Sequence, residues 1–88
     1  MYTIHKFPLQ IRPIQIIEVP QGAEFLSVHN QDELIAVWFR CDPSKPTEYR
    51  TMLIIMTGSA APPPEQSRFI GTVLLDHGTF VAHIFEGM

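Results

Sequence analysis

Two arginines and the only tryptophan of the chain are its best candidates for binding chemistry. Side chains alternate along a strand, so Trp38 and Arg40 share one face of the run LIAVWFR. Arg50 opens the next apolar run, and it comes close to Arg40 and the indole if these two strands pair. Arginine makes bidentate contacts with phosphates and carboxylates, and an indole offers a stacking face. The three residues predict a site for a small anionic, nucleotide-like ligand. The alternative is that Arg40 pairs with Asp42 or Glu48 while the indole packs in the core.

A second candidate is the loop TGSAAPPPEQ, which runs from Thr57 to Gln66 after the apolar run MLIIM. A phosphate-binding loop needs several glycines and a Lys–Ser/Thr pair opening a helix, but this loop has one glycine and no lysine. Its three consecutive prolines lack the N–H groups that a phosphate would use. The Gly-x-Ser-x-Gly pattern of a nucleophile elbow is not present around Ser59. We therefore expect a stiff connector, in which Thr57 and the Gly58 backbone line the rim of a pocket.

The histidines, the cysteine and the carboxylates form no recognisable motif for catalysis or metal binding. Zinc-binding histidines usually occur in close pairs such as HxH or HxxxH, and the four histidines here form no such pair. The single cysteine, Cys41, lies at an expected strand end between Arg40 and Asp42, where a structural role is more common than a reactive thiolate. The acidic residues lie mostly at expected strand ends and turns. We therefore predict no metal, no cofactor and no catalytic residue, and a protein that is not an enzyme.

The elements that must position these residues are short strands. Prolines and glycines divide the chain into runs rich in Ile, Val, Phe and Thr, which are typical of strands, and no long segment keeps a helical apolar period. The expected strands are Tyr2–Leu9, Ile14–Val19, Glu24–His29, Glu33–Cys41, Arg50–Thr57, Arg68–Leu75 and Thr79–Phe85. Short helical turns are expected at Asp42–Pro43 and Pro63–Ser67, and DHG (Asp76–Gly78) predicts a hairpin turn. The pattern predicts a mainly β fold, a compact antiparallel sandwich or small barrel of six or seven short strands with at most one or two short helical turns.

Two of the expected strands are apolar on both of their alternating faces, namely LIAVWF (Leu34–Phe39) and MLIIM (Met52–Met56). A strand in a sheet with one solvated face normally alternates, so these runs predict cover on both faces. A chain of 88 residues has little left to supply that cover. Large exposed apolar patches mark interfaces, and we therefore expect a homo-oligomer. The alternative is a monomeric sandwich or small barrel.

Length and charge restrict the function further. The 88 residues are expected to form a single domain, 1–88. Nine Asp and Glu outnumber six Lys and Arg and give a net charge of −3, so no basic face for nucleic acid is expected. The N-terminal residues lack the apolar core of a signal peptide, and the longest apolar run is far shorter than the ~20 residues of a membrane helix. We expect no nucleic-acid partner, no membrane partner and a cytoplasmic location.

Read end to end, the chain resembles a family of small, functionally uncharacterised proteins of bacteriophages and prophages. His83 matches a histidine of the family pattern, whereas Ala82 stands where the family has tryptophan. Ser59 and Ala60 stand where the family tends to have Gly-His. The resemblance is carried by KFPL (6–9), IIEVPQGAEFLSVHNQ (16–31), VWFRCDP (37–43), TG (57–58) and FIGTVLLDHGTFVAHIFE (69–86).

The resemblance implies a viral accessory protein in the cytoplasm of the host cell. Such proteins often counter host defence, either as oligomers that sequester a nucleotide signal or as inhibitors that bind a host effector protein. The leading hypothesis is a non-enzymatic counter-defence protein that binds a small anionic ligand at or near a homo-oligomer interface. A protein-binding inhibitor of a host defence effector and a virion or assembly component are the alternatives. The candidate ligand-binding residues are Trp38, Arg40, Arg50, Thr57, Gly58 and His83.

Overall fold

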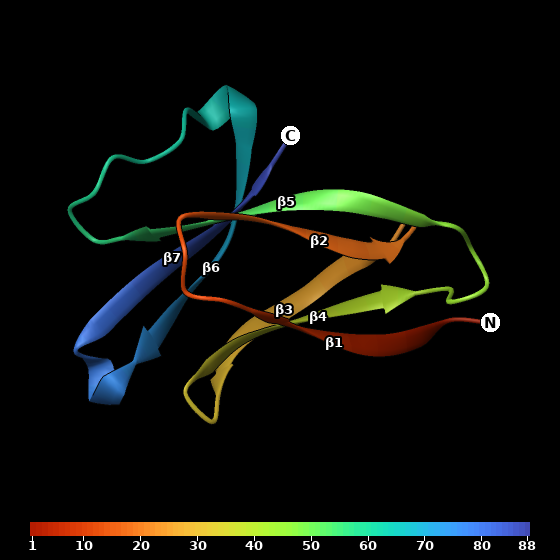
Figure 1. Cartoon of the computed structure of the whole chain (residues 1–88), viewed down its shortest axis with the longest axis horizontal. Coiled ribbons are helices and arrows are strands. Elements are labelled where there is room, and N and C mark those ends of the chain that lie inside the picture. Colours follow the sequence, from red (N-terminus) through yellow and green to blue (C-terminus); the bar gives the residue numbers. More distant parts are fainter.

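A computed structural model describes residues 1–88 and shows seven strands in two antiparallel sheets (Figure 1). The first sheet has the order β1-β4-β3 and the second has the order β2-β5-β7-β6. The predicted mainly β sandwich is confirmed, and the sheets do not close into a barrel. The elements are β1 (Thr3–Leu9), β2 (Ile14–Pro20), β3 (Glu24–Gln31), β4 (Leu34–Cys41), β5 (Thr47–Met56), the 3-10 turn η1 (Pro64–Gln66), β6 (Ser67–Leu75), the 3-10 turn η2 (Asp76–Gly78) and β7 (Phe80–Gly87).

The expected pairing of the strands that carry Arg40 and Arg50 is wrong. β4 lies between β1 and β3, whereas β5 lies between β2 and β7 in the other sheet. The connection between them holds Pro43 and Pro46, and the Pro46 carbonyl accepts a hydrogen bond from the Gln21 amide at 2.8 Å. A two-residue hairpin would have paired the strands, but this longer, proline-stiffened connection carries the chain across to the second sheet.

The core lies between the two sheets and takes alternate residues from each strand. From the first sheet, Ile35, Val37 and Phe39 of β4 point inward and are fully buried, and Met52 and Ile54 of β5 meet them from the second. The molecule measures 40 × 31 × 17 Å. Outside the seven strands, the only regular elements are the 3-10 turns η1 and η2, so no helix covers the outer face of either sheet.

The two sheets are fixed to each other at the corner where β3 meets β6. A Cβ atom on Gly71 would lie closer than 3.0 Å to the Val28 Cγ1 methyl, so only glycine fits this approach. The tips of the β3–β4 and β6–β7 hairpins lie at one end of the molecule (Figure 1) and are tied together. Asn30 donates to the Leu74 carbonyl at 2.9 Å, and the Asp76 amide donates to a Glu33 carboxylate oxygen at 2.6 Å.

The turns agree with much of the sequence pattern. Pro63–Ser67, predicted as a helical turn, contains η1, and DHG forms the predicted hairpin turn between β6 and β7. Asp42 begins a turn without a helix, because its carboxylate accepts hydrogen bonds from the backbone and hydroxyl of Ser44. Such side-chain bonding competes with helix formation.

Candidate binding surface

Three of the predicted site residues, Thr57, Gly58 and His83, lie together at the end of β5. Gly58 turns the chain with a φ of 92°, and Thr57 stands just after the last residue of the strand. The Thr57 hydroxyl lies 2.7 Å from His83 Nε2, and the Thr72 hydroxyl lies 3.0 Å from His83 Nδ1. Both ring nitrogens of His83 are therefore occupied, because a hydroxyl can either donate a hydrogen bond to an unprotonated ring nitrogen or accept one from a protonated ring nitrogen. The histidine is held across β5, β7 and β6 in a half-buried position.

His83 stands within an apolar outer face of the second sheet. One row of that face crosses all four strands, because Leu53 is opposite Ile14 on one side and Phe85 on the other, and Phe85 is opposite Phe69. The Phe69 and Phe85 rings meet edge to face at 5.4 Å between centroids. We define the apolar face by its large aliphatic and aromatic residues: Ile14, Ile16, Leu53, Ile55, Phe69, Leu74, Val81 and Phe85.

The residues of the apolar face are unusually open to solvent for their type. Ile16 is 65% exposed, Ile14 59%, and Phe69 and Leu74 55% each. Tyr49, 74% exposed, extends the surface along β5. Isolated apolar residues on a surface are ordinary, but a contiguous patch across a sheet indicates a binding surface.

The outer face of the first sheet mixes charged and apolar residues: it carries Trp38 and Arg40 together with the exposed side chains of Ile4 and Leu34. Trp38 is half-buried, with the His29 ring at 6.1 Å and Lys6 opposite it on β1. The Lys6 ammonium donates to the Gln31 side chain at 2.7 Å. Charged and amide groups thus surround the indole, and the structure does not place it beside Thr57 or His83.

Arg40 is exposed and pairs with Glu24 across the β3–β4 ladder. Neither of the partners suggested by the sequence, Asp42 or Glu48, takes this role. An open hollow of about 430 Å³ lies beside the pair and is lined by Tyr2, Gly22, Glu24 and Arg40.

Arg50 points into the sandwich and is neutralised there. Its guanidinium is paired with Glu86 and lies 3.3 Å from a Glu48 carboxylate oxygen. It also donates to the Ala23 carbonyl at 3.0 Å and lies 5.2 Å from the centre of the Phe39 ring. The hydrogen bond to Glu86 raises the pKa of Arg50 above its ordinary value, against the opposing effect of burial. With its donors engaged inside the protein, Arg50 holds strands together.

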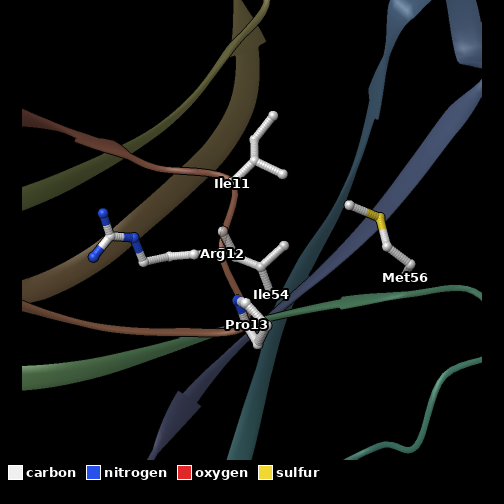
Figure 2. A pocket seen from close by; sticks show the side chains of 5 residues that line it. All are labelled: Ile11, Arg12, Pro13, Ile54 and Met56. Carbon is white, nitrogen blue, oxygen red and sulfur yellow. The ribbon is translucent and has the colours of Figure 1, made fainter.

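A smaller apolar pocket, of about 220 Å³, opens where the β1–β2 connection passes the end of β5 (Figure 2). Its walls are Ile11, Pro13, Ile54 and Met56, while the Arg12 guanidinium points away from Met56. Arg12 is hydrogen-bonded to Gln10. No pattern in the sequence indicated this pocket beyond the turn dipeptide Arg12-Pro13.

The remaining polar residues do not assemble a second site. Cys41 is buried in the core, and no group of three or more His, Cys, Asp or Glu side chains is placed to hold a metal ion. The structure contains no helix long and apolar enough to span a membrane.

Comparison with known proteins gives one result. A family model described as "Domain of unknown function (DUF7352)" matches residues 1–88, the whole of the chain. No curated protein and no solved structure matches it.

Proposed function

We propose a binding function for this chain, which belongs to the DUF7352 family of domains of unknown function. The protein acts without catalysis, and its working surface is the apolar face of the second sheet. The observation that carries the proposal is the exposure of Ile14, Ile16, Phe69 and Leu74 together on one face, each more than half open to solvent. A solvated sheet face is normally polar, so exposed residues of this type support a partner that covers the face.

The partner that fits this surface is a protein. The face is broad and carries aliphatic and aromatic side chains, as the central parts of protein–protein interfaces do. The resemblance to bacteriophage and prophage proteins, carried by stretches such as KFPL and IIEVPQGAEF, supports a phage accessory protein that acts in the host cytoplasm. We place its role in counter-defence, as an inhibitor that covers an apolar surface of a host effector protein.

Affinity capture from a bacterial host lysate tests this function. The immobilised native protein is compared with Phe69→Glu, in the apolar face, and with Ile4→Glu, a matched control on the outer face of the first sheet where Ile4 is 61% exposed. We expect a defined partner to be retained by the native protein and by Ile4→Glu and lost by Phe69→Glu. Retention of the same partner by all three proteins, or by none, contradicts the proposal. Thermal unfolding of each variant checks that it is folded.

The hollow beside Arg40 favours a second candidate function, the binding of a small anionic ligand. Arg40 and Tyr2 are both exposed at this hollow, which offers a guanidinium and an aromatic ring to a nucleotide-like molecule. Glu24 must release Arg40 for the ligand to bind. A thermal-shift screen with cyclic dinucleotides and ADP-ribose tests this function, with Arg40→Gln as the control. A shift that persists in Arg40→Gln, or no shift with any ligand, counts against it.

A further inference from the structure

We propose that a second copy of this chain covers the apolar face, so that two sandwiches pack face to face about a two-fold axis. The inference rests on the proposed function, because it uses the same surface: the second copy covers the face while no host protein is bound, and a host protein must displace that copy in order to bind. In a two-fold dimer the same patch is used by both copies, so the surface must be suitable for contact with itself.

The exposed area of the face is close to what a stable dimer needs. Ile14, Ile16, Phe69 and Leu74 are 55–65% exposed and Tyr49 is 74% exposed. At roughly 200 Å² for a fully exposed large side chain, these five residues offer roughly 600 Å² per copy. The half-buried residues Leu53, Ile55, Val81 and Phe85 raise this value toward the ~800 Å² per partner of a standard interface.

The charge pattern also fits self-association. The chain has a net charge of −3, so two copies repel each other in general. The outward residues of the central strands β5 and β7, however, include no Lys, Arg, Asp or Glu. The outer face of the first sheet is different, because it carries Lys6, Glu24 and Arg40. On the edge strand β2 the outward residue Glu18, opposite Tyr49, is charged, so repulsion between copies is weakest at the centre of the apolar face.

The polar groups near the centre of the face do not oppose burial. His83 has both ring nitrogens bonded to the Thr57 and Thr72 hydroxyls within its own chain. Burying a polar group is costly mainly when it loses its hydrogen-bond partners. A partner sheet about 10 Å away can thus cover His83 without leaving either ring nitrogen unsatisfied.

Sedimentation velocity and light scattering test the dimer with the full chain. We compare the native protein with Ile16→Glu and Phe69→Glu, on opposite edge strands of the second sheet, and with the control Ile4→Glu. The substituted residues are all more than half exposed, so the folded monomer tolerates them. We expect the native protein and Ile4→Glu to have twice the mass of one chain. Each face substitution occurs twice in the dimer and should weaken association by about 100-fold or more.

Four outcomes separate this inference from the proposed function. A native protein that stays monomeric at about 100 µM, far above the Kd of a stable interface, overturns the inference. A dimer that survives both face substitutions also overturns it, because the contact then lies elsewhere. If the native protein is monomeric while Phe69→Glu still abolishes capture of a host protein, the inference fails and the proposed function stands. If the dimer behaves as expected but capture is unaffected, the proposed function fails alone.

Discussion

Replacing Gly71 with alanine should strain the corner where the two sheets come closest. The new Cβ would lie closer than 3.0 Å to Val28 Cγ1. Val28 is buried and has a branched, rotationally stiff side chain, so it cannot turn aside freely. Inserting a methyl group into a packed core costs about 1–3 kcal/mol. In a domain of this size, each kcal/mol lowers Tm by about 4–8 °C, so Gly71→Ala should melt clearly below the native protein.

A double-mutant cycle tests whether the clash with Val28 is the cause. Val28→Ala removes the Cγ1 methyl and is itself destabilising, because it leaves a cavity. If the clash is real, the double variant loses less stability than the two single variants together, by about 1 kcal/mol or more. Denaturant unfolding at one protein concentration measures all four proteins, since the stability of a dimer depends on concentration. Additive losses, or a Gly71→Ala protein as stable as the native one, would refute the reasoning.

Two further predictions concern ionised groups. Arg50→Met leaves the buried Glu86 carboxylate without its main partner, and it should lower the free energy of unfolding in urea by about 3 kcal/mol. The control Arg68→Met removes an exposed arginine 3.5 Å from Glu86 and should lower it by about 1 kcal/mol or less. Equal losses of stability in the two variants would contradict this assignment. The second concerns Glu33, whose pKa lies below its ordinary value because of hydrogen bonds from the Asn30 amide and then the Asp76 N–H. Because the folded pKa is depressed, this stabilisation is present above the ordinary value of 4.5 and is lost as the pH falls through the lower folded value. Tm measured from pH 6 to pH 3 should therefore fall less steeply in Glu33→Gln than in the native protein. Parallel curves would argue that the hydrogen bonds from Asn30 and Asp76 to the Glu33 carboxylate do not stabilise the fold.

The sequence predicted the strands well because the signals that mark a strand, its apolar pattern and its flanking turn residues, lie within a short stretch of the chain. MLIIM was apolar on both faces, and the structure explains both: Met52 and Ile54 enter the core, while Leu53 and Ile55 belong to the apolar face. The run LIAVWF has a different explanation. Of its outward residues, Ala36 is buried and Trp38 is partly covered within the same chain, between Lys6 and Ser27 on the neighbouring strands, whereas Leu34 is 56% exposed.

The candidate site was harder to predict because it depends on which strands pair. Trp38, Arg40 and Arg50 are close in the sequence, and the assumption that their strands form a hairpin placed them together. The Asp42–Pro46 connection instead changes sheets. The main partner of Arg50, Glu86, lies 36 residues away, and no local pattern joins them. The signal for the apolar face was present in alternate residues such as Ile14 and Ile16, but it could be read only once β2, β5, β7 and β6 were known to be neighbours.

The unlike outer faces of the two sheets determine how far assembly can proceed. If both outer faces were apolar, every added copy would expose another apolar face that could bind a further copy, and the sandwiches would stack into an open filament. Here the far side of each copy carries the charged residues Lys6, Glu24 and Arg40 among exposed apolar residues such as Ile4, so it offers no continuous apolar surface to a further copy. Two of the four edge strands also resist lateral growth, because β1 contains Pro8 and β6 is interrupted by a bulge between Phe69 and Gly71. We therefore expect the proposed association through the apolar face to stop at a closed pair.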